Sequence, residues 1–97
     1  MIEVRRTGVF DRWLGGLRDS AARARILVRI NRLELGNFGD AKFFEGIGEL
    51  RIDYGPGYRV YFVRRGDVVV VLLSGGDKSS QRRDIAAAKA IAEDLGE

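Results

Sequence analysis

The chain has 97 residues, which is enough for one domain with a single modest hydrophobic core and too few for two. It contains neither cysteine nor histidine, which excludes disulfide bonds, thiolate nucleophiles, His-dependent hydrolases and Cys- or His-ligated metal sites. The formal net charge is +3, from 17 basic and 14 acidic side chains, and this bias is too small to indicate nucleic-acid binding by itself. Because no apolar run could span a membrane and no signal-peptide pattern opens the chain, we expect a cytoplasmic protein without a membrane partner.

The first third of the chain predicts one strand followed by two helices. Residues 2–6 begin with alternating apolar and polar side chains, as in a half-buried strand. Thr7 is suited to cap a helix in which apolar side chains recur at helical spacing over residues 10–17. A longer helix should follow, for which Asp19 and Ser20 are the cap candidates, and it should run to about residue 35, where a Gly-Asn pair ends it.

Three arginines, Arg25, Arg29 and Arg32, share one face of the longer helix. A row of this kind is typical of a solvated helix face, but it can also bind phosphate groups or an acidic partner. The sequence shows no obvious counter-charge for the row and no exposed apolar row beside it. Both interpretations stay open from these residues alone.

The second half of the chain predicts three consecutive strands and a last helix. Residues 36–48 form a Gly-rich connection without a predicted strand. Strands are expected over residues 49–54, 58–64 and 68–73. Short turns between them require an antiparallel meander, in which the continuously apolar third strand should lie centrally and be covered on both faces. Ser79 or Ser80 can cap the last helix, which continues to about Leu95.

These elements predict an α+β fold in the order β-α-α-β-β-β-α, with a mostly antiparallel sheet and helices packed on it. No repeat, linker or low-complexity segment divides the chain, so residues 1–97 should form a single small domain.

The segment from Gly75 to Ser79 imitates a phosphate-binding P-loop in its order of strand, glycines, lysine and helix. The match fails because that motif requires Gly directly before the Lys and another Gly five residues earlier, where this chain has Asp77 and Leu72. The glycine pair should end the preceding strand and still leaves Lys78 beside a helix N-terminus. That combination predicts an anion site.

Two arginines are expected side by side on the predicted hairpin. If the strands pair about the Gly55-Pro56-Gly57 turn, Arg51 and Arg59 lie on neighbouring strands and point away from the more apolar face. Burying such cations without a partner is unfavourable. They should therefore either form ion pairs with Glu49 or Asp53, or grip a phosphate group together.

Tyrosines and a lysine accompany this pair. Tyr54, Tyr58 and Tyr61 belong to the same hairpin, and each can either pack in the core or stack on an unpaired base. Lys42, in the Gly-rich connection, is either a solvated loop lysine or a further cation of the site. The carboxylates show no tight spacing that would single out a metal site, so we expect neither a metal nor a cofactor.

The motifs of the second half resemble those of a known toxin family. The stretches KFFEGIGELRIDYGPGYRVYF at residues 42–62 and LLSGGDKSSQ at residues 72–81, followed by Asp84-Ile85, are similar to the signature of HigB-like addiction-module killer proteins, a branch of the RelE/ParE toxin superfamily. The segments RINRL at residues 29–33 and GNFGD at residues 36–40 fit the same pattern. The resemblance covers nearly the whole chain, and the superfamily has the element order predicted above.

The resemblance implies a bacterial type II toxin. Such toxins commonly cut mRNA in the ribosomal A site, and a cognate antitoxin with a helix-turn-helix DNA-binding domain usually holds HigB-like members inactive. On the ParE side of the superfamily, toxins poison DNA gyrase without nuclease activity, so the shared fold leaves the activity open. A third alternative is a decayed toxin that only binds its antitoxin.

The absence of histidine is compatible with a nuclease that relies on Lys, Arg or Tyr, as several RelE-type enzymes do. Cleavage by an internal 2′-hydroxyl needs a base, an acid and stabilisation of the charged phosphorane. By resemblance, Arg51 and Arg59 hold the scissile phosphate and Lys78 supplies a proton acceptor or a further cation, while the assignment of base and acid stays open. Substrate binding is assigned to Lys42, Tyr58, Tyr61, Gln81, Arg25, Arg29 and Arg32, with the three helix arginines docking on ribosomal RNA. Because Arg51 and Arg59 lie on a polar face, we expect removal of either to leave the fold intact.

Overall fold

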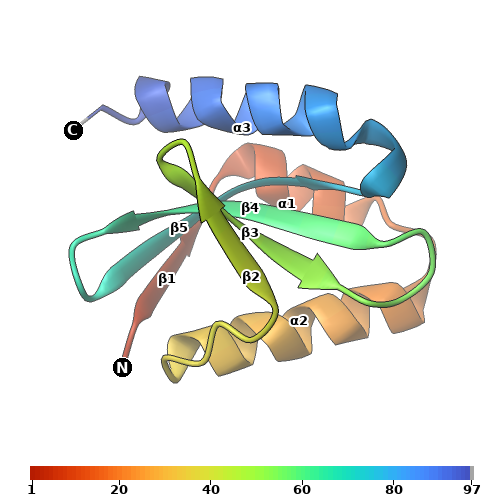
Figure 1. Cartoon of the computed structure of the whole chain (residues 1–97). Coiled ribbons are helices and arrows are strands. Elements are labelled where there is room, and N and C mark those ends of the chain that lie inside the picture. The colour runs from red at the N-terminus through yellow and green to blue at the C-terminus, as the bar shows by residue number, and fades with distance from the viewer. Residues whose placement is uncertain (97) are drawn as a thin grey trace.

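Five strands form one sheet in the order β1-β5-β4-β3-β2 (Figure 1). The arrangement is that of a computed structural model of the protein, which describes residues 1–96. The strands are β1 (Glu3–Arg6), β2 (Ala41–Phe44), β3 (Ile47–Ile52), β4 (Tyr58–Arg65) and β5 (Val69–Gly76). β1 runs parallel to β5 and the other neighbours pair antiparallel, so the predicted α+β fold with a mostly antiparallel sheet is confirmed.

Three helices cover the two faces of the sheet. They are α1 (Gly8–Gly15), α2 (Ser20–Glu34) and α3 (Gln81–Asp94). α1 and α2 pack on one face and α3 on the other, and Figure 1 shows α3 above the sheet and α2 below it. The predicted caps start the first two helices: the Thr7 hydroxyl accepts a hydrogen bond from the N–H of Phe10, and the Asp19 carboxylate accepts two from the first turn of α2. Among residues 1–96, no helix is both long and apolar enough to cross a bilayer.

The larger part of the core lies between the sheet and the pair α1 and α2. Phe10 from α1 and Leu33 from α2 are fully buried there against the sheet residue Phe62. Burial of such a side chain contributes about 1.5–3 kcal/mol, so this face supplies most of the hydrophobic stabilisation. β5 is central as predicted, because Leu72 belongs to this cluster and Leu73 to the smaller cluster beneath α3.

The structure adds one strand to the predicted order. β2 lies within the segment predicted as a Gly-rich connection and pairs with β3 at the edge of the sheet. The turn Glu45-Gly46 joins the two strands with φ angles of 52° and 86°, a left-handed pair that suits a two-residue hairpin. The four residues of β2 do not alternate between apolar and polar, which is why the sequence pattern did not reveal this strand.

β5 continues through the two glycines that were predicted to end it. A Cβ atom on Gly75 would come within 2.3 Å of the Trp13 ring, and one on Gly76 within 1.8 Å of the Asp84 carboxylate. The glycines therefore let α1 and α3 approach the strand closely rather than turning the chain.

Candidate nucleic-acid cleft

A cleft of about 460 Å³ opens between the β3–β4 turn and a short 3₁₀ helix, η1 (Lys78–Ser80), which precedes α3. It is lined by Asp40, Arg51, Ile52, Asp53, Gly55, Pro56, Gly57, Arg59 and Lys78. The cleft thus brings together all three residues predicted to be catalytic, Arg51, Arg59 and Lys78, although they come from β3, β4 and η1. Three cations facing one cleft can bind and neutralise a phosphate group.

Arg51 and Arg59 are direct partners in the antiparallel register of β3 and β4, as the hairpin pattern predicts. The turn between them requires left-handed backbone at Gly55 and Gly57, with φ angles of 57° and 81°. The Arg51 guanidinium is 37% exposed and forms an ion pair with Asp40, whose Oδ1 lies 2.8 Å from Nη2. The residue also lines the cleft.

The sequence left Glu49 and Asp53 as the possible ion-pair partners of Arg51, and the structure corrects this because the partner is Asp40. Asp40 directly precedes β2, and the pairing of β2 with β3 brings its backbone carbonyl to the Arg51 N–H at 2.9 Å. Because β2 was not predicted, this neighbour could not be predicted either.

Arg59 is more deeply placed than Arg51, with a side chain only 13% exposed. Its Nη1 donates to the carbonyl oxygens of Gly57 and Tyr58 at 3.1 and 3.3 Å. Its Nε lies 3.9 Å from Oε2 of the buried Glu49 and donates no hydrogen bond. The guanidinium therefore lines the cleft on one side and faces a buried carboxylate on the other, so Glu49 is the partner that the sequence left open for Arg59.

Lys78 is exposed at the opposite wall of the cleft. Its backbone N–H donates to the Pro56 carbonyl at 3.4 Å, which ties η1 to the β3–β4 turn. A Cβ atom on Gly57 would lie 3.4 Å from both the Cβ of Lys78 and Nη1 of Arg59, so both side chains pass close to this glycine. Lys78 and Arg59 therefore line the same cleft from η1 and β4.

The helix N-terminus beside Lys78 is not an open anion site, which corrects the prediction from the Gly-Gly-Asp-Lys segment. The Asp77 carboxylate itself accepts hydrogen bonds from the backbone N–H and the hydroxyl of Ser79, at 2.8 and 2.6 Å. These hydrogen bonds from Ser79 lower the pKa of Asp77. The carboxylate occupies the position that an anion would take, and only the Lys78 side chain remains available to a ligand.

Two residues assigned to substrate binding point away from the cleft. Tyr61 is fully buried beneath α3, so its ring has no face open to a base, and the prediction that it stacks on RNA is wrong for this reason. The Gln81 amide nitrogen donates to Oε2 of Glu49 at 2.7 Å, which directs this side chain into the buried cluster behind Arg59.

Tyr58 and Lys42 lie near the cleft without lining it. Tyr58 is half-buried and its ring meets Trp13 edge-on, with 6.3 Å between the ring centroids. Lys42 is exposed on β2, opposite Glu49 in the register and one strand further from Arg59. Their roles toward a substrate stay predictions.

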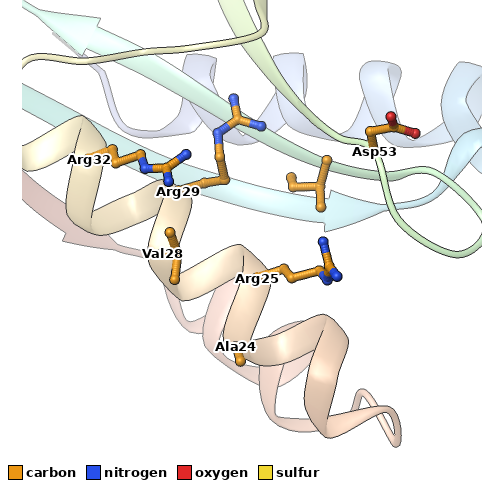
Figure 2. Close-up of a pocket in the computed structure, with 7 residues that line it drawn as sticks. Ala24, Arg25, Val28, Arg29, Arg32 and Asp53 are labelled. Atoms are coloured by element: carbon orange, nitrogen blue, oxygen red, sulfur yellow. The ribbon is translucent and has the colours of Figure 1, made fainter.

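A second groove of about 300 Å³ lies between α2 and the end of β3 (Figure 2). The helix arginines line it together with Ala24, Val28, Ile52 and Asp53, and the last two also line the cleft. Val28 is 45% exposed, so an apolar side chain does accompany the arginine row, contrary to the sequence-based expectation.

The three helix arginines differ in how they are engaged. Arg29 donates to the backbone carbonyls of Phe38 and Asp40, each at 3.0 Å, and to that of Arg51. Burial lowers the pKa of the Arg29 guanidinium. The Arg25 guanidinium lies 4.5 Å from the centre of the Tyr54 ring, and Arg32 is exposed. Arg29 therefore anchors the loop before β2, and Arg25 and Arg32 form the accessible part of the row.

No group of three or more acidic side chains among residues 1–96 is arranged to hold a metal ion. The accessible charges of the cleft are those of its three cations and of Asp40 and Asp53. Such a site can bind phosphate directly through side-chain donors.

Comparisons with known proteins place the chain in a family. The model of the family described as "Phage derived protein Gp49-like (DUF891)" matches residues 12–95, which include every residue of the cleft. The chain is also similar to an uncharacterised protein of Haemophilus influenzae, with 52% identity over 96 residues that cover 98% of this chain and 97% of the relative. The protein therefore belongs to the Gp49-like phage-derived protein family, a toxin-like family of addiction modules.

Proposed function

We propose that the protein is the toxin of a type II toxin–antitoxin module and acts as a metal-independent endoribonuclease that cleaves mRNA on the ribosome. The observation that carries the proposal is the meeting of Arg51, Arg59 and Lys78 in one cleft. Membership of a toxin-like family supports the toxin part, and the HigB-like sequence motifs favour the nuclease branch. Its substrate would place the protein in the cytoplasm, beside translating ribosomes.

In the proposed reaction, the 2′-hydroxyl of the RNA attacks the adjacent phosphorus atom. A base accepts the 2′-hydroxyl proton, the bond from phosphorus to the 5′-oxygen breaks, and an acid donates a proton to that oxygen. Arg51 and Arg59 neutralise the additional negative charge of the phosphorane. Guanidinium groups stay protonated, so of the three cations only Lys78 can transfer a proton, as the base in its neutral form or as the acid in its charged form, and a water molecule would carry out the other transfer.

The groove along α2 extends the proposed RNA surface. It adjoins the cleft through Ile52 and Asp53, and its accessible cations are Arg25 and Arg32. We assign these two arginines to contacts with ribosomal RNA phosphates, while Arg29 supports the loop on which Asp40 lies. The partner that holds the toxin inactive would be a cognate helix-turn-helix antitoxin.

The test is induction of the protein in bacteria without an antitoxin, followed by primer extension on translated transcripts. New cleavage ends should appear with the wild type and disappear with Arg51→Ala and with Lys78→Ala. Matched controls are Arg5→Ala on the far edge strand and Lys89→Ala, whose ammonium pairs with Glu45 on the surface. Growth arrest with intact mRNA and inhibited DNA supercoiling would contradict the nuclease proposal and would indicate a gyrase poison. Harmless induction of folded protein would indicate a decayed toxin.

A further inference from the structure

Glu49 is the one charged side chain that is fully buried in the part of the chain that the structure describes, with 1% of its surface exposed. A carboxylate in this position is strongly destabilising unless a cation and hydrogen-bond donors compensate it. It lies on β3 and faces α3, on the side of the sheet with the smaller apolar cluster. Its burial therefore calls for a reason beyond packing.

Two side chains compensate Glu49 at the same oxygen atom. Gln81 Nε2 donates to Oε2 at 2.7 Å, and Arg59 Nε lies 3.9 Å from Oε2. Arg59 Nε is buried and donates no hydrogen bond, so the Glu49 carboxylate, 3.9 Å away, is its ion-pair partner. Glu49 thus holds the inner side of the guanidinium whose outer side lines the cleft.

The surroundings of this pair are buried and negatively charged. Tyr61 pairs with Glu49 in the register of β3 and β4, and the Tyr61 hydroxyl has no hydrogen-bond partner. Burial, together with the nearby charges of Glu49 and Asp84, raises the pKa of Tyr61, so the phenol stays protonated. The Asp84 carboxylate lies so close to Gly76 that a Cβ atom there would collide with it. A second negative group therefore lies beneath the same part of the sheet.

Glu49 cannot itself take a proton from the substrate, because it is buried and does not line the cleft. It can act only through Arg59. We propose that Glu49 is a positioning residue that, together with Gln81, fixes the Arg59 guanidinium toward the scissile phosphate; this inference rests on the proposed nuclease function. Gln81 begins α3 directly after η1, so the same contact also fixes β3 relative to the turn that carries Lys78.

The effect on the reaction would come from preorganisation. A cation that is already oriented stabilises the phosphorane without first having to reorient, whereas a mobile guanidinium loses part of that stabilisation. Loss of Glu49 should therefore lower kcat and leave KM little changed, because the outer surface that binds RNA is untouched.

The experiment measures cleavage of a defined mRNA on programmed ribosomes by purified wild type, Glu49→Gln, Arg59→Lys and the double variant. Glu49→Gln should lower kcat roughly tenfold. The double variant should be no slower than Arg59→Lys alone, because both changes act on the same guanidinium contact. The matched control is Glu45→Gln, the same chemical change at an exposed residue, which should cleave like the wild type.

Two outcomes would overturn the assignment: a Glu49→Gln variant with the kcat of the wild type, or losses that multiply in the double variant. If Glu49→Gln does not fold, Gln81→Met takes its place in the test. This change removes the hydrogen-bond donor to Glu49 and keeps the shape of the side chain, and it must also lower kcat.

A second readout separates this inference from the proposed function. Hydrogen exchange of the Arg59 Nε–H, followed by ¹⁵N NMR in the free protein, should be slow in the wild type, because Nε is buried beside the Glu49 carboxylate. It should be faster in Glu49→Gln, because the guanidinium then loses its ion-pair partner and becomes more mobile. If the wild type cleaves no RNA, the nuclease proposal fails while faster exchange still supports positioning of Arg59. Equal exchange in both proteins would overturn it.

Discussion

The two faces of the sheet are built by different means. The face beneath α1 and α2 is closed by a large apolar cluster, in which Phe10, Leu33 and Phe62 have no exposed surface. The face beneath α3 has a smaller apolar cluster and buries Glu49, Ser74 and the hydroxyl of Tyr61 beside it. Burial of apolar groups stabilises a fold, whereas burial of unpaired polar groups opposes it. The cleft adjoins the face beneath α3. The proposed site therefore lies on the face whose buried polar groups contribute less to the stability of the fold.

The largest expected effect tests this contrast with two consecutive residues of β4. Phe62→Ala removes a fully buried ring from the apolar face and should lower the free energy of unfolding by about 3–5 kcal/mol. Tyr61→Phe on the other face removes only an unpaired hydroxyl and should change it by less than about 1 kcal/mol. Urea denaturation measures both. A large loss in Tyr61→Phe would mean that its hydroxyl is well bonded and that the two faces do not differ in this way.

The next effect concerns Arg59 and changes the expectation drawn from the sequence. Arg59→Ala leaves Glu49 buried without its cation and should lower the free energy of unfolding by about 2 kcal/mol, less than for a fully buried pair because the two groups are 3.9 Å apart. The double variant Arg59→Ala/Glu49→Gln should recover part of that loss, since an amide is less unfavourable than a carboxylate in a buried position. Denaturation of the three proteins gives the comparison. A double variant less stable than Arg59→Ala would exclude a buried charge as the cause.

Arg51 should behave differently from its neighbour on β4, because it is partly exposed and paired with Asp40 at the surface. Arg51→Ala should change the free energy of unfolding by less than about 1 kcal/mol. Cleavage should nevertheless fall about 100-fold, because a donor to the phosphorane is removed. Denaturation and cleavage rates on the same preparation separate the two effects. Wild-type cleavage by this variant would remove Arg51 from the site.

Local patterns account for most of the fold. The caps at Thr7 and Asp19, the turn at Gly55-Pro56-Gly57 and the apolar run of β5 each depend on residues close in sequence, and each was predicted. The same turn predicted that Arg51 and Arg59 would be neighbours. Lys78 was tied to them only by resemblance to a toxin family, since no local pattern relates η1 to the hairpin.

The features that were not predicted depend on contacts distant in sequence. Asp40 meets Arg51 only because β2 forms, and Gly76 is required only because α3 brings Asp84 over it. Arg29 looks like any solvated helix arginine until the loop before β2 folds back onto it. In the alternation of β4, Tyr61 falls on the polar face, and only the packing of α3 on that face buries it.

Charge reversal on the outer surface of α2 should change the stability of the protein less than the variants above, but it should clearly weaken ribosome binding. Arg25→Glu/Arg32→Glu reverses the two accessible charges of the groove and leaves Arg29 on its carbonyls. Ribosome binding should weaken, and the slope of its salt dependence should fall by roughly 0.7–0.9 for each phosphate that the variant no longer neutralises. Arg5→Glu/Arg64→Glu, the same charge change on exposed strand residues, is the control for net charge. If both pairs weaken binding equally, the α2 groove is not a specific RNA surface.

The smallest effect is the pH dependence of the cap of α2. Asp19 accepts a hydrogen bond from the Tyr54 hydroxyl at 2.9 Å and others from the first turn of α2, and these bonds lower its pKa. The pKa of the folded state thus lies below the unfolded value of about 3.9. The carboxylate therefore stabilises the protein above that value, and this contribution disappears as the pH falls through the lowered folded-state pKa.

Asp19→Asn tests this assignment, because asparagine can still cap the helix but carries no charge. The variant should melt slightly below the wild type near neutral pH. This gap in melting temperature should close as the pH falls below the unfolded value of about 3.9 and through the lowered folded-state pKa of Asp19, because the wild-type carboxylate then becomes protonated. Melting temperatures across this range measure the gap, with Asp67→Asn in the exposed β4–β5 turn as the matched control. A gap that stays constant would show that the difference between the side chains, and not the charge of Asp19, determines the stability of this cap. A gap that widens toward low pH would reverse the sign argued here and would place the folded-state pKa of Asp19 above its unfolded value.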